Sequence, residues 1–141
     1  MTAARPRRGE WLRRGQTVAT GAWAAPTTAV GWVAILLAGP QVSRTRRDAV
    51  VLVTGPGAGR LFDRLNPRLR IGAMTLGGVI LARDEATAEQ NWQHELVHVA
   101  QARHWGPLFL PAYGLASLVA WATGHDVYEA NFFELEARQL A

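Results

Sequence analysis

The sequence predicts an α+β fold in a single domain over residues 1–141, with a small antiparallel sheet and several helices. Three observations support this prediction. The chain has 141 residues, which suits one domain. Short β-branched runs beside glycines predict strands up to residue 83, and capped segments beyond it predict longer helices. Hydrophobic residues make up 49% of the chain, as in ordinary globular proteins.

Charge and cysteine content narrow the classes of function. There is no cysteine, so disulfides are excluded and any metal site must use histidine and carboxylates. Residues 1–70 hold 12 arginines and three acids, a net charge of +9, whereas residues 71–141 carry a net charge of −5. A basic half can face nucleic acid or an anionic membrane. No nucleic acid is expected, because the arginines lack interleaved aromatic residues and a helix-turn-helix pattern.

The chain begins with a basic segment, residues 1–14, that we expect to be flexible, followed by an apolar segment, 15–43, without charges. A helix is predicted over about 26–38, because Pro26 suits a first turn and Gly39-Pro40 ends it. At about 21 Å this helix is shorter than a bilayer span, unless it continues upstream. A cleaved signal peptide is an alternative, but the apolar run starts late and shows no clear cleavage site.

Residues 49–141 are expected to form the metal-site core, whose first elements are strands. Residues 44–48 are predicted as a polar link, and the run 49–53 as a strand. The stretch 55–60 is rich in glycine but lacks the Gly-Lys-Ser/Thr ending of a phosphate loop, so we expect a turn. Residues 71–83 are predicted to form two strands around Gly77-Gly78.

The helices that follow are predicted from their caps. Asp84 is a good N-cap for a helix over 85–105, which Gly106-Pro107 ends. A second charge-free run, 106–124, contains a predicted apolar helix, 111–123. A helix that is apolar on every side is buried in protein or in lipid, so we expect the two apolar helices to pack together and contact a membrane.

The last helix is predicted over about 126–140.

Two histidines lie four residues apart on the helix over 85–105, in the pattern His94-Glu95-x-x-His98. That spacing points both imidazoles to one place and sets Glu95 beside it. This pattern on a helix is the metalloprotease signature, in which the histidines bind zinc and the glutamate is the general base.

A catalytic zinc site needs a third protein ligand. His104 lies ten residues after His94, but an unbroken helix places it about 280° round and about 15 Å along. Glu134 is the better candidate, because Ala130 and Ala137 on its stripe let its helix approach closely. The alternative is that Glu134 pairs with Arg138 on an exposed face. His125, Tyr128, Asn131 and Glu136 are candidates for supporting a ligand or stabilising an oxyanion.

These residues resemble a known family. The histidine motif with the downstream Glu134-x-Glu136-Ala137 is similar to the gluzincin metallopeptidases, distantly to the membrane-associated Ste24/HtpX and BlaR types and more closely to small bacterial proteins of that kind. The similarity covers roughly residues 72–137. It implies a minimal zincin-like domain, with Glu134 as the third zinc ligand. Arg138 departs from the pattern, because such enzymes usually carry an aspartate there that supports a zinc-bound histidine.

The resemblance also implies a peptide or protein substrate that adds a strand along Thr75, Leu76, Gly77 and Val79. The expected function is therefore zinc-dependent peptide hydrolysis with Zn²⁺ as cofactor. The alternative is a non-catalytic or degenerate zinc-binding protein.

Membrane contact is expected through residues 15–43 and 106–124, at the cytoplasmic membrane, with a soluble cytoplasmic protein as the alternative. A homo-oligomer could complete the cleft of so small a domain.

Overall fold

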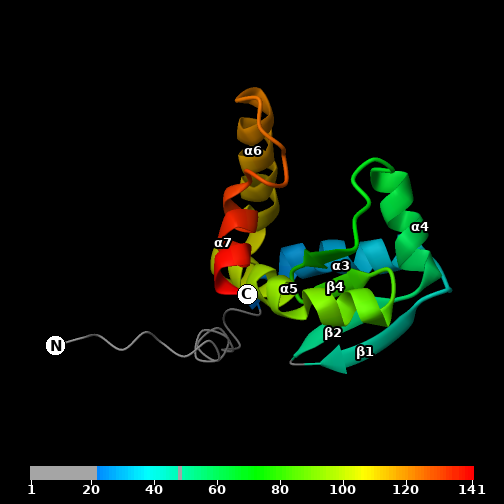
Figure 1. Cartoon of the computed structure of the whole chain (residues 1–141). Helices are drawn as coiled ribbons and strands as arrows, with labels where there is room; N and C mark the ends of the chain where they lie inside the picture. Colours follow the sequence, from blue (N-terminus) through cyan, green and yellow to red (C-terminus); the bar gives the residue numbers. More distant parts are fainter. Residues whose placement is uncertain (1–21, 48) are drawn as a thin grey trace.

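A computed structural model describes residues 22–47 and 49–141 and confirms the α+β class (Figure 1). Helices cover both faces of a central sheet, and two further helices stand at one end (Figure 1). The predictions for residues 1–14 and for the start of the apolar segment, 15–21, lie outside the described residues.

The sheet has four strands in the order β1-β2-β4-β3. They are β1 (Ser43–Arg47), β2 (Val50–Thr54), β3 (Ala73–Leu76) and β4 (Val79–Ala82). Strands β2 and β4 run parallel and the other pairs run antiparallel, so the prediction of an antiparallel sheet is wrong for the central pair. The physical reason lies in these two strands, which are largely buried apolar runs, and such runs are typical of parallel central strands.

Strand β1 occupies one edge, where a polar link was expected. All five of its residues are exposed, so no apolar alternation marks it as a strand. Its register pairs Arg44 with Val53 of β2. The Arg47 side chain reaches the helix over residues 85–105. Its guanidinium lies 4.3 Å from the ring centre of Trp92 there and forms a salt bridge with Glu89. Charged side chains on an edge strand discourage pairing with other chains.

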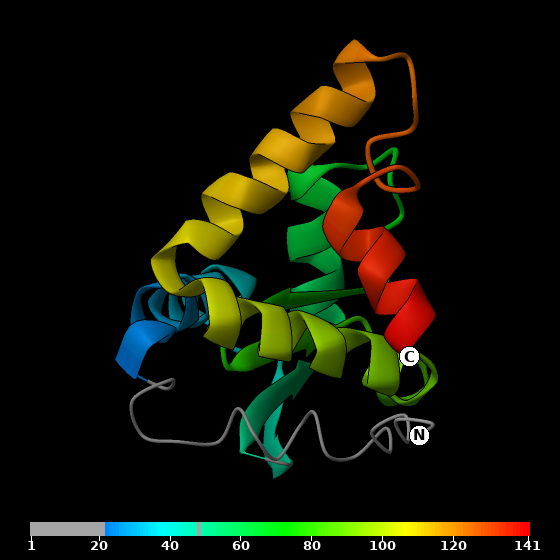
Figure 2. The ribbon, with the colours of Figure 1, turned by 90° about the vertical axis from the view of Figure 1, so that its left-hand side faces the viewer.

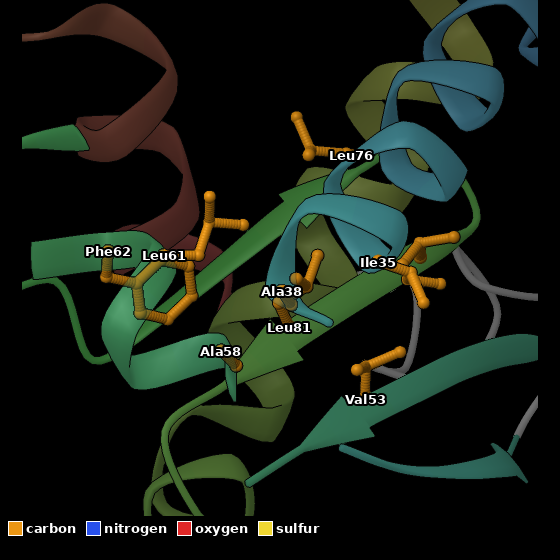
Figure 3. Packing of buried hydrophobic residues seen from close by; sticks show 9 residues of the cluster. Ile35, Ala38, Val53, Ala58, Leu61, Phe62, Leu76 and Leu81 are labelled. Carbon is orange, nitrogen blue, oxygen red and sulfur yellow. The ribbon is translucent and has the colours of Figure 1, made fainter. Parts of the chain in front are cut away.

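One face of the sheet is covered by α3 (Ala25–Ala38) and α4 (Pro56–Leu65). Figure 3 shows Ile35 and Ala38 of α3 and Phe62 of α4 over the strand side chains Val53 and Leu81. The helix α4 replaces the turn expected over 55–60. Gly57 serves close packing, since a Cβ there would lie 2.4 Å from the backbone oxygen of Ala38.

The other face is covered by α5 (Glu85–Trp105), which has the bounds that the sequence predicts. The Asp84 side chain accepts a hydrogen bond of 2.7 Å from the backbone N–H of Thr87 and so caps the helix. Trp92, Leu96 and Val99 of α5 pack on side chains of β2 and β4 that point to this face. The packing fixes which side of α5 is turned away from the sheet.

A short 3-10 turn, η1 (Gly106–Leu108), leads into α6 (Phe109–Ala122), and α7 (Phe132–Leu140) ends the chain. Figures 1 and 2 show α6 projecting away from the sheet, with α7 beside it. By contrast, α3 lies against one face of the sheet, where it contacts β3 and β4. The expectation that the two apolar helices pack together is therefore wrong. Helix α3 instead contacts η1, the turn that leads into α6, where the Thr27 hydroxyl donates to the Gly106 backbone oxygen over 2.9 Å.

The last helix begins at Phe132 and not near residue 126. The Asp126 carboxylate accepts hydrogen bonds from the backbone N–H groups of Tyr128 and Glu129, which makes a turn there instead. Asn131 then caps α7. Within residues 22–47 and 49–141, no helix combines the length and apolar character needed to cross a membrane.

The contact between α3 and the hairpin of β3 and β4 depends on Gly31. A Cβ there would lie 2.7 Å from the Val79 Cβ and 2.8 Å from the Leu76 oxygen. We predict that Gly31→Ala lowers the free energy of unfolding by about 1–3 kcal/mol, because the helix must shift off the sheet. Gly114→Ala in α6 is the matched control, since its Cβ meets nothing within 4 Å. The control should be neutral or stabilising by up to about 1 kcal/mol. Urea unfolding measures both, and equal effects would contradict the packing.

Candidate metal centre

His94 and His98 lie on the side of α5 that faces α6 and α7. Their ring centres are 4.7 Å apart with the rings nearly perpendicular, and the two Nε2 atoms are 3.1 Å apart. His98 is buried, and His94 is partly exposed. The spacing of one helical turn therefore brings two nitrogen ligands to one point, as the sequence predicts.

The third group of the site is Glu134 in the first turns of α7. Its Oε2 lies 3.0 Å from His94 Nε2 and its Oε1 lies 3.2 Å from His98 Nε2. The residue is only 2% exposed. The first two turns of α7 are held close to α5 because Ala137, on the same stripe, is fully buried and leaves room.

Asn131 sets the position of Glu134 by fixing the start of α7. Its side-chain oxygen accepts from the Phe133 backbone N–H over 2.9 Å. Its amide nitrogen donates to the Tyr113 backbone oxygen and to the Ser117 hydroxyl on α6. Phe133 packs in an aromatic cluster with Phe109 and Tyr113. Asn131 is thus a fully buried tie between α6 and α7, and these hydrogen bonds engage its side chain.

The donor set could hold a metal ion. Ligand atoms of His94, His98 and Glu134 all lie within 4.8 Å of one another. Tetrahedral zinc with bonds near 2.1 Å needs neighbouring ligand atoms about 3.4 Å apart. The two Nε2 atoms are 3.1 Å apart, and each of them has one of the two Glu134 oxygens within 3.2 Å, so a small shift of the side chains would suit one shared ion. His104 is not in the group, as its place on the helix predicts.

The electrostatics of the cluster favour an ionised Glu134. Burial acts to raise the pKa of Glu134, but its contacts with the two imidazoles and with Tyr113 outweigh burial and hold that pKa well below its usual range. Burial acts to lower the pKa of His98, and the nearby Glu134 carboxylate raises it overall. Glu134 is thus in the anionic form that a zinc ligand needs, whereas a zinc ion would displace any proton from His98 Nε2 when it binds.

Glu95, the predicted general base, is held by the sheet. It is buried, and its Oε2 accepts a hydrogen bond of 2.6 Å from the Thr75 hydroxyl on β3. Burial raises the pKa of Glu95, although the Thr75 bond and the two imidazoles oppose that shift. A carboxylate with a raised pKa, one residue from a ligand, is suited to accepting and returning a proton.

Sequence reasoning missed Gln101, which lies one turn beyond His98 on α5. Its Oε1 is 2.7 Å from His98 Nδ1. Its Nε2 donates to the Phe133 backbone oxygen over 3.0 Å and to the Glu136 carboxylate over 2.8 Å. Its position seven residues after His94 puts it on the same face of the helix, which was the available sequence indication.

Two tyrosines are influenced by the Glu134 carboxylate, and one of them contacts it. The Tyr113 hydroxyl donates to Glu134 Oε1 over 2.6 Å, a contact that the apolar character of α6 concealed in the sequence. Burial, with the Glu134 charge, raises the pKa of Tyr113. The same two causes raise the pKa of Tyr128, which was a predicted candidate and is 44% exposed. Both phenols therefore stay protonated hydrogen-bond donors at neutral pH.

Three further predicted residues do not contact the cluster of His94, His98 and Glu134 directly. His125 lies in the turn after α6, where its ring nitrogen is 3.1 Å from the Thr123 hydroxyl, and the structure does not bring it to the cluster. Glu136 joins the site indirectly, through Gln101. Arg138 donates to the backbone oxygen of Glu129, so it is not paired with Glu134 as the alternative required.

The predicted substrate strand divides into two parts. Thr75 and Leu76 lie on β3, which is an edge strand, and Gly77 forms the turn after it with φ of 64°. Val79 lies on β4, which is paired on both sides and fully buried. Val79 therefore cannot receive an added strand, and this part of the prediction is wrong. The run of Gly77-Gly78 reverses the chain and so separates the two residues into different strands.

Comparison of the chain with protein-family models, with curated proteins and with solved structures finds no match.

The ligand set makes a prediction about stability. Zinc in excess should raise the melting temperature of the wild-type protein, because a ligand that binds only the folded state stabilises it. Glu134→Ala should lower zinc content and remove most of that rise, since it deletes one of the three ligands. His104→Ala should change neither quantity. Metal analysis and thermal unfolding measure both variants, and the opposite ranking would mean that the geometry is wrong.

Proposed function

We propose that this chain is a zinc-dependent peptidase. The observation that carries the proposal is the meeting of His94, His98 and Glu134, with the buried carboxylate of Glu95 directly beside the first ligand. Two imidazoles and one carboxylate are the ligands of a catalytic zinc site that keeps a position for water. A structural site would instead be closed by four protein ligands.

Zinc is the metal that this donor set favours. Imidazole nitrogens suit zinc, whereas magnesium and calcium take oxygen ligands. When bound, zinc lowers the pKa of a water molecule toward about 7 and polarises a carbonyl group. The ionised state of Glu134 supports this assignment, because a ligand carboxylate must be deprotonated.

The protein groups have separate roles in the proposed reaction. Glu95 takes a proton from the attacking water and gives it to the leaving amine. Thr75 holds the Glu95 carboxylate in place through its hydroxyl, so that the base does not rotate out of reach. Tyr128 stays protonated and is the candidate donor to the negative charge that develops on the carbonyl oxygen. Tyr113 holds Oε1 of Glu134.

The substrate in this proposal is an extended peptide that pairs with β3. This strand is an edge of the sheet, and it carries Thr75, whose side chain contacts the base. A peptide added at an edge strand gains backbone hydrogen bonds whatever its sequence. The scissile bond would thus be delivered close to Glu95 by the sheet itself.

We also propose that the protein contacts a lipid surface through α3 and α6. Both helices carry no charge and expose large side chains, among them Leu36 at 79% and Leu37 at 62% on α3, and Trp121 at 68% on α6. Exposed apolar faces of this kind mark sites of interaction. Exposed arginines follow α3 directly on β1, and arginine attracts anionic lipid headgroups.

The peptidase proposal is tested with Glu95→Gln, which keeps the size of the side chain and removes its basicity. Glu85→Gln, at an exposed position on the same helix, is the matched control. We predict that Glu95→Gln retains zinc and loses peptide hydrolysis by at least about a hundredfold, as expected for a lost general base. The control should keep both. Cleavage of a peptide library and metal analysis measure the outcome.

Zinc in the wild-type protein without cleavage of any peptide would instead favour the non-catalytic zinc-binding alternative. Unchanged hydrolysis in Glu95→Gln would contradict the assigned base.

The lipid proposal is tested by sedimentation with phosphatidylcholine vesicles that contain phosphatidylglycerol. We predict that the wild-type protein sediments with them and that Leu36→Ser with Leu37→Ser reduces binding several-fold, because it removes exposed apolar area. Leu65→Ser on α4 is the matched control, since Leu65 is 59% exposed outside these helices. If the protein does not sediment with the vesicles and forms dimers in solution, the apolar faces bind a second copy of the chain instead.

A further inference from the structure

We infer that Gln101 is a positioning residue that decides which ring nitrogen of His98 carries the proton, and thereby presents the Nε2 lone pair to the metal. The inference rests on the proposed metal site but not on peptide hydrolysis. It concerns a chain of contacts from His98 through Gln101 to Glu136 and to the backbone of α7.

The orientation of the Gln101 amide is fixed by its other contacts. One end of the amide faces two oxygen acceptors, the Phe133 backbone oxygen at 3.0 Å and the Glu136 carboxylate at 2.8 Å. Only the NH₂ group can donate to both. A flipped amide would set its oxygen against these two acceptors in a buried place, which costs the hydrogen bonds and adds repulsion. The oxygen of Gln101 must therefore face His98.

The orientation of the amide then determines the state of the imidazole. Gln101 Oε1 lies 2.7 Å from His98 Nδ1, and an amide oxygen can only accept. Nδ1 must therefore carry a hydrogen. In the neutral ring this leaves Nε2 unprotonated, with its lone pair directed to the point shared with His94 and Glu134. Metal-bound histidines commonly donate their second nitrogen to an acceptor in this way.

Glu136 anchors this arrangement, and it does so from the helix that also carries Glu134. The two residues lie two apart on α7, and one supplies a carboxylate to the cluster while the other orients Gln101. The acid that the resemblance leads one to expect at Arg138 is therefore not needed for orienting His98. A glutamine from α5 with a glutamate behind it performs the same task.

The direct test is the tautomer of His98, observed by ¹⁵N NMR of the ring in the metal-free protein at a pH where the ring is neutral. We predict that the proton is on Nδ1 in the wild-type protein. In Gln101→Leu it should move toward Nε2, because the acceptor at Nδ1 is lost and Glu134 remains near Nε2. Wild-type His98 with its proton on Nε2 would overturn the inference, whether or not zinc binds.

Zinc affinity gives a second readout, measured by competition with a chelator. Gln101→Leu should raise the zinc Kd about 10- to 100-fold, the usual effect of removing a group that orients a ligand histidine. Gln90→Leu, at an exposed position on α5, is the matched control and should leave the Kd unchanged. Far-ultraviolet circular dichroism of each variant confirms that the helices are retained.

Exchange of the two partners separates orientation from simple packing. Gln101→Glu alone sets two carboxylates against each other at the 2.8 Å contact and should weaken zinc binding. In Gln101→Glu with Glu136→Gln the contact between residues 101 and 136 again joins a donor to an acceptor, although the Phe133 oxygen still faces a carboxylate. The zinc Kd should therefore be clearly lower than in Gln101→Glu alone, without a full return to the wild-type value. A double variant as weak as the single one, with intact helices, would contradict the inference. Absence of zinc from the wild-type protein would overturn the proposed function, while the tautomer would still test Gln101.

Discussion

A buried carboxylate between two imidazoles is the interaction on which the second half of this protein depends. Glu134 is almost inaccessible to water, and an unpaired charge in such a place would cost several kcal/mol. His94 contacts its Oε2 and the Tyr113 hydroxyl donates to its Oε1, while His98 lies close to the same oxygen. Because these partners come from α5 and α6, the charge can be stabilised only when α5, α6 and α7 are packed in one arrangement.

The polar contacts around Glu134 also explain why a small domain can hold such a site. The sheet and α5 form an apolar core of their own, which fixes the face that α5 turns outward. Asn131 and Gln101 then tie α7 to α6 and α5 with buried hydrogen bonds. Buried polar networks of this type favour one arrangement over others when every member is paired. The site is thus supported by rigid helices and by Thr75 of the sheet.

The helix 85–105, the strand pair around Gly77-Gly78 and the three residues of the candidate metal centre could be predicted from the sequence, because each leaves a local pattern. Asp84 and Gly106 mark the ends of α5, and the spacing of His94 and His98 marks its functional face. Small residues at positions 130 and 137 marked the stripe of Glu134. The rejection of His104 followed from helix geometry alone.

The remaining features depend on contacts between distant segments. The parallel pairing of β2 with β4 follows from how α4 returns the chain, and α4 itself was concealed by its glycines, of which Gly57 allows the close approach to α3. Strand β1 has no apolar residue that could mark it. Gln101 and Tyr113 act across helix interfaces, so neither has a local signature that separates it from a surface glutamine or a core tyrosine.

Crystallographic location of zinc by anomalous diffraction tests the shared site most directly. For crystals of the protein with zinc, we predict one strong peak about 2.0–2.2 Å from Nε2 of His94, Nε2 of His98 and a carboxylate oxygen of Glu134. A peak held by other residues, or a protein that takes up no zinc when it is supplied in excess, would contradict the metal centre.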